Sequence, residues 1–162
     1  MSRAKIRLPG YITEQIREAL LKYGSRECGG ILMGEHVGHD EFRVVNLTVQ
    51  SQAGTISRFV RAVASFVTKL AAFFERTGYR YQKYNYLGEW HSHPLFALQP
   101  SRDDFLTMRD IIDDSEVGAN FVVLMLAKLS NGNVESKAWT LIPGGVLIEA
   151  DVIPEGATHE QQ

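Results

Sequence analysis

Residues 84–104 read YNYLGEWHSHPLFALQPSRDD, and within this stretch a strand pattern gives way to a loop and then to a helix pattern. Its first half is rich in aromatic side chains and has no helical apolar stripe, so we predict a buried strand that enters a loop at Pro94. Side chains two positions apart on a strand point to the same face. His91 and His93 can therefore reach one ion together.

A helix start follows this loop. Ser101 suits the N-cap position, and apolar residues recur at helical spacing over residues 102–114. Asp104 then lies in the first helical turn, where the helix dipole and the unpaired backbone N–H groups favour an ionised carboxylate. This carboxylate is available as a third ligand beside the two histidines.

Two imidazoles and one carboxylate form a ligand set that suits zinc. Three protein ligands leave a fourth tetrahedral position for water, which is typical of a catalytic rather than a structural zinc. Bound zinc lowers the pKa of water from about 15.7 to about 7. Each part also has a simpler interpretation, since His-Ser-His can be polar residues at a strand end, and Ser101 with Asp104 can be a helix-capping pair.

Together with an upstream glutamate, these residues resemble the JAMM motif of the JAB/MPN metalloproteases. That motif consists of a distant Glu, then His-Ser/Thr-His, seven residues, Ser, two residues and Asp. The chain contains every position of it, in the order Glu27, His91-Ser92-His93, residues 94–100, Ser101, Arg102-Asp103 and Asp104. The prolines after the second His and before the Ser are also similar to the family.

The resemblance implies a role for each of these residues. His91, His93 and Asp104 would bind one Zn²⁺ per chain. Glu27 would be the general acid/base that acts on the zinc-bound water, and Ser101 would hydrogen-bond the oxyanion of the tetrahedral intermediate. The resemblance thus implies a JAMM-type zinc metalloprotease, an isopeptidase similar to deubiquitinases.

Residues 27–34, ECGGILMG, are small and aliphatic, and they predict a central strand whose glycines allow close backbone approach. The stretch resembles the first catalytic strand of the family. Glu27 is therefore preferred as the base over Glu35, which we expect beyond the strand at a hairpin turn. We interpret His36 and His39, in the same turn, as solvated residues, because no nearby carboxylate completes a metal site.

Hydrophobic periodicity predicts further elements along the chain, with Thr13 as a candidate N-cap of the first helix. We expect strands at residues 6–8, 41–50, 119–129, 134–141 and 146–153, the last at a sheet edge, and helices at residues 11–23 and 58–76. These elements predict an α/β fold class, with one mixed β-sheet flanked by two or three helices. The resemblance implies a single MPN (JAB) domain over residues 1–153, and residues 154–162 are expected to form a frayed tail.

The composition is that of an ordinary globular protein. The chain has 162 residues, of which 44% are hydrophobic and 22% charged, so one domain with an adequate core is expected. The net charge of −2 lacks the basic excess typical of nucleic-acid binding. The single cysteine, Cys28, fits a reducing compartment, and no apolar stretch has the length of a membrane span. We therefore expect a soluble cytoplasmic protein.

The resemblance implies that the enzyme cleaves after the C-terminus of a ubiquitin-like protein, for deconjugation or precursor processing. Prokaryotic members of the family accompany E1-like and E2-like conjugation proteins, some of them in antiphage defence. Two alternatives stay open at this point. The first is a zinc peptidase that acts on a sulfur-carrier precursor or a small peptide, and the second is a non-catalytic MPN scaffold. Scaffold members usually lose motif ligands, which this chain retains.

Overall fold

A computed structural model describes residues 3–51, 68–115 and 118–156 of the chain. In these residues eight strands form one sheet in the order β3-β1-β8-β7-β6-β5-β2-β4, and β3 also pairs with β2. The elements are β1 (Lys5–Leu8), α1 (Gly10–Tyr23), β2 (Cys28–Gly38), β3 (Glu41–Leu47), β4 (Gln50–Ser51), β5 (Tyr84–Ser92), α3 (Arg102–Asp113), β6 (Val122–Ser130), β7 (Asn133–Leu141) and β8 (Ile148–Pro154). A further helix covers residues 68–76.

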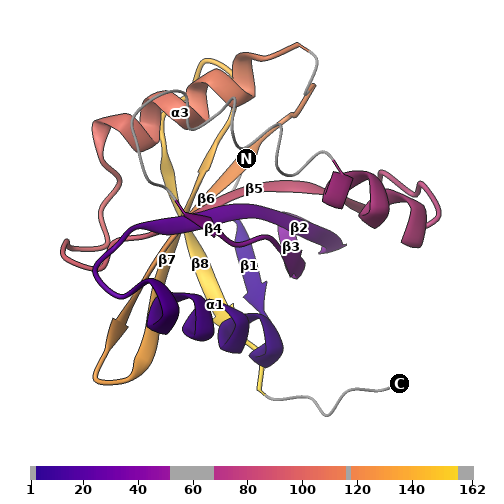
Figure 1. Cartoon of the computed structure of the whole chain (residues 1–162). Helices are drawn as coiled ribbons and strands as arrows, with labels where there is room; N and C mark the ends of the chain where they lie inside the picture. The colour runs from indigo at the N-terminus through magenta and orange to yellow at the C-terminus, as the bar shows by residue number, and fades with distance from the viewer. Residues whose placement is uncertain (1–2, 52–67, 116–117, 157–162) are drawn as a thin grey trace.

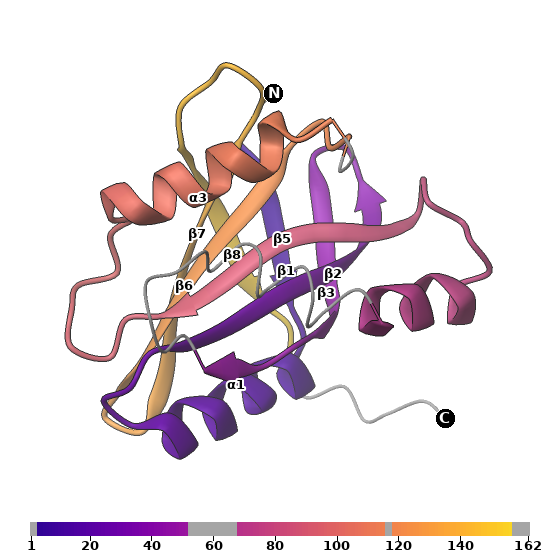
Figure 2. The same ribbon diagram turned by 45° about the horizontal axis from the view of Figure 1, so that its top comes forward.

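The sheet closes on itself, because β2 pairs with β5 on one side and with β3 on the other. The antiparallel ladder between β2 and β3 contains two register shifts, at Met33/Gly34 and at His36/Gly38. Such bulges bend a strand and increase its twist, which a closed barrel requires. The mixed α/β class with flanking helices is confirmed. The single sheet, however, forms a barrel-like ring, with α1 and α3 on opposite sides of it (Figures 1 and 2).

The apolar strand β6 is buried on both faces, as its continuous apolar sequence predicts. Val123 and Met125 contribute to the core inside the barrel, which α1 also covers. Leu124 and Leu126 contribute to a second core beneath α3. In the neighbouring strand β5, Leu87 and Trp90 belong to the first of these cores, and Tyr86 packs against the second.

Helix α1 begins at Gly10 and ends before Gly24, whose positive φ of 59° suits glycine. Its buried residues are Ile12, Ile16, Ala19 and Leu20. The proposal of Thr13 as N-cap was wrong. Pro9 is the N-cap, and its carbonyl accepts the backbone N–H groups of Ile12 and Thr13 at 3.0 Å, so no side-chain cap is needed.

Strand β2 is longer than predicted and extends to Gly38. Glu35 and His36 therefore lie within the strand and not in a turn, because the ladder with β3 continues through them. The ring of His36 stacks on Phe42 of β3 at 5.0 Å between centroids. His39 lies in the turn, 3.5 Å from an Asp40 carboxylate oxygen and almost fully exposed, which agrees with its interpretation as a solvated residue.

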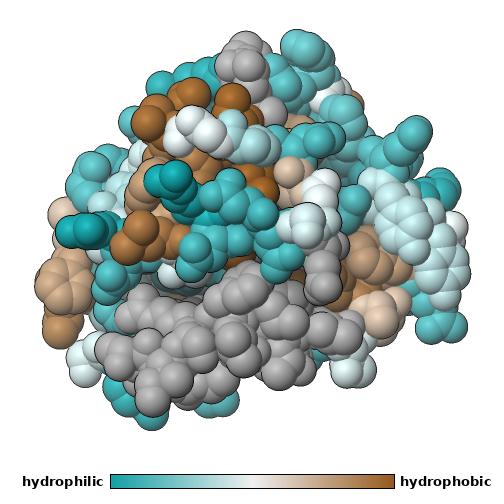
Figure 3. Space-filling view, turned by 90° about the horizontal axis from the view of Figure 1, so that it is seen from above, coloured by the Kyte–Doolittle hydropathy of each residue, from teal (hydrophilic) through white to brown (hydrophobic). Residues whose placement is uncertain are grey.

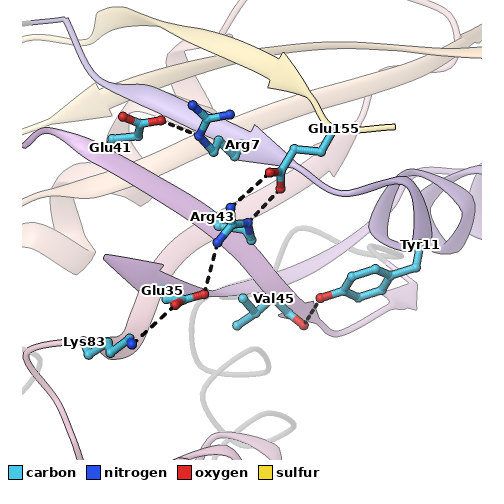
Figure 4. A network of polar contacts seen from close by, with 8 residues as sticks. All are labelled: Arg7, Tyr11, Glu35, Glu41, Arg43, Val45, Lys83 and Glu155. Atoms are coloured by element: carbon cyan, nitrogen blue, oxygen red, sulfur yellow. Dashed lines mark hydrogen bonds and ion pairs between the residues drawn. The ribbon is translucent and has the colours of Figure 1, made fainter. Parts of the chain in front are cut away.

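The last strand, β8, is not an edge strand. It pairs with β7 and, in parallel, with β1. Pro154 belongs to this strand, and the Glu155 carboxylate accepts hydrogen bonds from Arg43 Nε at 2.8 Å and Nη2 at 3.0 Å (Figure 4). This bidentate pair holds the chain in place just after β8.

The arginine that binds Glu155 belongs to a wider polar network on this side of the barrel (Figure 4). Arg43 Nη1 also donates to Glu35 at 3.4 Å, and Lys83 Nζ lies 3.8 Å from the same carboxylate. Arg7 of β1 donates to Glu41 of β3. These ion pairs tie together strands that are distant in the sequence.

Part of the chain between β4 and β5 lies outside the described residues. This applies to residues 52–67, which include the first half of the helix expected at residues 58–76. The described part of that helix buries Phe73 against Ile31 and Met33 of β2. None of the helices in residues 3–51, 68–115 and 118–156 is both long and apolar enough to cross a membrane.

Candidate active site

His91 and His93 lie at the end of β5, as the sequence predicts. His91 pairs with Gly29 of β2 and with Leu126 of β6, so the strand that carries it is fixed on both sides. The backbone N–H of His93 donates to the Ala127 carbonyl at 2.9 Å and continues the ladder with β6. Both imidazoles are buried.

The alternate residues of β5 face the other way and fix the strand. The Trp90 indole N–H donates to the Thr48 carbonyl at 2.9 Å inside the core. Ser92 Oγ accepts the backbone N–H of Cys28 at 2.8 Å. Cys28 is a free, buried thiol, and burial raises its pKa, although the hydrogen bond with Ser92 acts in the opposite direction.

Ser101 and Asp104 form a capping box at the start of α3. Ser101 Oγ accepts the Asp104 backbone N–H at 3.0 Å, and Asp104 Oδ2 accepts the Ser101 backbone N–H at 2.8 Å. The helix-capping interpretation is therefore confirmed, and it does not compete with the metal-binding one. Asp104 still turns its carboxylate toward both histidines.

The three expected metal ligands are brought together in space. Asp104 Oδ1 lies 3.0 Å from His91 Nδ1, and Asp104 Oδ2 lies 3.3 Å from His93 Nε2. Ligand atoms around a tetrahedral zinc at about 2.0 Å are about 3.3 Å apart, so these separations are close to what zinc requires. Within the described residues, no set of three or more His, Cys, Asp or Glu side chains surrounds a space ready for an ion. Here the side chains hydrogen-bond one another, and zinc would replace those bonds.

The charges in this cluster depend on one another. Burial alone would lower the pKa of His91, but its hydrogen bonds to Asp104 and Glu89 outweigh burial and raise that pKa to about 9. The hydrogen bond to Asp104 also raises the pKa of His93. Burial would raise the pKa of Asp104, whereas the hydrogen bonds from the two histidines hold it well below its usual range. Without a metal, the carboxylate is therefore ionised and His91 is protonated at neutral pH.

Glu27 and Ser101 line one cavity of about 440 Å³ together with the histidines and Asp104. Glu27 directly precedes β2, and the antiparallel register that places Gly29 opposite His91 carries Glu27 toward the end of β5. This ladder explains how a residue so distant in the sequence comes to the site. Phe96, in the loop after β5, also lines the cavity and is 61% exposed. From above, the described surface shows separate apolar patches among hydrophilic residues (Figure 3).

Glu89 is a site residue that the sequence prediction missed. Its side chain is buried on β5, and its Oε2 lies 3.0 Å from His91 Nε2. The signal in the sequence is its position two residues before His91, which places both side chains on one face of the strand.

Comparisons with known proteins bear on the family and the fold of this chain. Residues 10–142 match the model of the Prok-JAB family, described as prokaryotic homologs of the JAB domain. A protein of Enterobacter hormaechei subsp. hoffmannii (strain UCI 50), named CD-NTase/cGAS isopeptidase, is 31% identical over 106 residues, which make up 64% of this chain and 56% of that protein. This chain thus spans little more than half the length of that relative.

Two solved structures share the fold. A solution structure from Desulfitobacterium hafniense has a TM-score of 0.65 at 18% identity, with 96% of this chain and 99% of that chain covered. A second, from Salinibacter ruber (strain DSM 13855), has a TM-score of 0.55 at 21% identity and covers 92% and 91%. Because the family model matches most of the chain, from α1 to the end of β7, this protein belongs to the prokaryotic JAB-domain family.

Proposed function

We propose that this protein is a zinc-dependent isopeptidase or peptidase that cleaves after the C-terminus of a ubiquitin-like protein. The observation that carries the proposal is the convergence of Glu27, Ser101 and the three candidate ligands on one cavity. The name of the Enterobacter relative, an isopeptidase, supports the same class of reaction.

His91, His93 and Asp104 would hold the zinc ion. Their chemistry fits, because two imidazoles and one carboxylate are a ligand set of catalytic zinc sites. When bound, zinc supplies a Lewis acid that polarises the scissile carbonyl and lowers the pKa of water. The ligands are supported from both sides, by the β5–β6 ladder behind His91 and by the capping box behind Asp104.

Glu27 is the proton carrier of this proposal. Its carboxylate takes a proton from the attacking water and passes it to the leaving amine, which is a lysine side chain in a conjugate or a backbone amine in a precursor. The position of Glu27 on the wall of the cavity, immediately before the strongly paired strand β2, supports this role. A base on a fixed strand end keeps its distance to the reacting atoms.

Ser101 stabilises the developing oxyanion. Its Oγ accepts the backbone N–H of Asp104, which fixes the oxygen in place while the hydroxyl hydrogen stays available as a donor. A donor that is already oriented lowers the transition-state energy more than it stabilises the substrate.

The substrate that suits this site best is an extended chain end. A ubiquitin-like protein presents such an end with small residues before the scissile bond, which can enter a cavity bordered by the Phe96 loop. We further propose that the conjugates are made by E1-like and E2-like proteins of the same bacterial system, in a setting of antiphage defence.

Cleavage of a ubiquitin-like protein tests the function. The substrate is the product of a neighbouring gene, extended past its C-terminal glycine, and the enzymes are zinc-loaded wild type and Glu27→Gln. We expect wild type to cleave at that glycine and Glu27→Gln to be slower by about 10²- to 10⁴-fold with equal zinc content. Equal rates would refute the role of Glu27. If the wild-type protein binds this partner but does not bind zinc and does not cleave, it is a scaffold.

A further inference from the structure

Glu89 is a buried carboxylate on β5. It is 4% exposed and lies on β5 between Ile31 of β2 and Leu124 of β6, both fully buried apolar residues. A carboxylate in such surroundings costs several kcal/mol unless it is hydrogen-bonded and its charge is compensated. The Glu89 carboxylate can therefore stay buried only if a partner compensates its charge.

That partner is the outer nitrogen of His91. His91 Nε2 lies 3.0 Å from Glu89 Oε2, on the side of the ring away from Asp104. An ionised carboxylate only accepts hydrogen bonds, so Nε2 must carry a hydrogen and donate it. The other ring nitrogen, Nδ1, then supplies the lone pair when the imidazole is neutral, and it is Nδ1 that faces Asp104.

His93 has the opposite arrangement. Its Nδ1 lies 3.2 Å from the carbonyl oxygen of Ala97, to which it donates, and its Nε2 faces Asp104. The two histidines therefore present different nitrogens to the same point. One is oriented by a buried carboxylate and the other by a backbone carbonyl.

We propose that Glu89 is a positioning residue that holds His91 so that it binds zinc through Nδ1, while His93 binds through Nε2. Glu89 touches neither the metal nor the substrate and acts only through the His91 ring. Carboxylates behind metal-binding histidines typically change metal affinity by about 10- to 100-fold. The inference rests on the zinc site of the proposed function, but not on its substrate.

The zinc affinity of the folded 162-residue chain, measured by competition with a chromophoric chelator, tests the proposal. Glu89→Met removes the acceptor and the charge at similar volume, and we expect it to weaken zinc binding by about 10- to 100-fold. Glu89→Gln keeps an oxygen that accepts from Nε2 and should recover most of the affinity. Glu149→Gln, an exposed carboxylate on β8, is the matched control and should bind as wild type does.

A second measurement does not depend on the folding of a variant. Long-range ¹H–¹⁵N NMR spectra of the zinc-loaded wild type identify which nitrogen of each histidine binds the metal. We expect Nδ1 of His91 and Nε2 of His93. Binding through Nε2 of His91, or a Glu89→Met variant with wild-type affinity, overturns the inference and leaves the proposed function standing. Zinc binding with the expected Glu89 effect but without cleavage refutes only the proposed function, and a wild type that binds no zinc refutes both.

Discussion

Ser101 and Asp104 accept each other's backbone N–H groups, at 3.0 and 2.8 Å, while Asp104 also contacts both histidines. The start of α3 and the candidate metal site are therefore built from the same carboxylate. Asp104 is held by the helix start before any metal binds. A disturbance of the cap would shift the Asp104 carboxylate. A substitution of Ser101 therefore has two separable effects, one on the capping of α3 and one on catalysis.

Replacement of Ser101 by glycine separates capping from catalysis. Glycine at an N-cap costs only a few tenths of a kcal/mol, so the melting temperature should stay near that of wild type, whereas Ser101→Ala should cost about 1 kcal/mol. Both variants lack the hydroxyl, and kcat should fall by about 10²- to 10³-fold in each. Thermal unfolding and single-turnover kinetics measure the two effects. A fully active Ser101→Gly variant would show that the hydroxyl has no role beyond the cap.

Zinc should stabilise the folded protein through His91. At a free zinc concentration of about 100 times Kd, a ligand that binds only the native state contributes about 2.7 kcal/mol, which raises the melting temperature by roughly 5–10 °C for a chain of this size. His91→Ala should abolish the rise. His39→Ala, at the exposed turn histidine, should keep it. An equal rise in both variants would place the zinc elsewhere.

The zinc-free protein should lose stability as the pH rises above neutrality. The pKa of His91 is raised to about 9, above the unfolded value of about 6.5, so its contribution is complete below pH 6.5 and is lost as the pH passes 9. That contribution is on the order of 3 kcal/mol. Because the pKa of Asp104 is lowered, its contribution is lost instead in acid. Thermal unfolding with a chelator, from pH 5 to 10, measures this. In His91→Phe the melting temperature should fall less between neutral and alkaline pH than in wild type. An unchanged fall would contradict the assignment of this stability to His91.

Gly30 of β2 is predicted to tolerate no side chain. A Cβ there would lie 2.1 Å from the Thr48 carbonyl oxygen and 2.5 Å from its hydroxyl, so the backbone must move. Gly30→Ala should destabilise the protein by roughly 1–3 kcal/mol, the usual cost of overpacking, or by more. Gly156→Ala, where no atom lies within 4 Å, is the control and should be neutral. Chemical denaturation of both variants measures the difference.

Four residues of the candidate site could be brought together from local signals in the sequence. His91 and His93 share a strand face, and Ser101 with Asp104 forms a helix start of four residues. Glu27 needed the family resemblance, since only the long-range β2–β5 ladder brings it to the cavity. Glu89 was missed because a charged residue in a strand is normally a solvated one.

The sequence pattern also did not predict that the sheet closes into a barrel. Closure depends on β1 pairing in parallel with both β3 and β8, contacts between segments far apart in the chain. Hydrophobic alternation reports which face of a strand is buried, but not its neighbours. For the same reason β8 was assigned to an edge, although both of its sides are paired.

The ring of strands also determines the order in which parts of the molecule unfold. Neither β5 nor β2 can leave without breaking two ladders, whereas α3 is held by side-chain packing and by the loop that leads into it. Native-state hydrogen exchange should therefore find α3 opening before the strands that carry the histidines. A metal ion bound by side chains at the end of β5 and at the start of α3 would link the helix to the barrel. Its removal would destabilise the docking of α3 and leave the barrel folded.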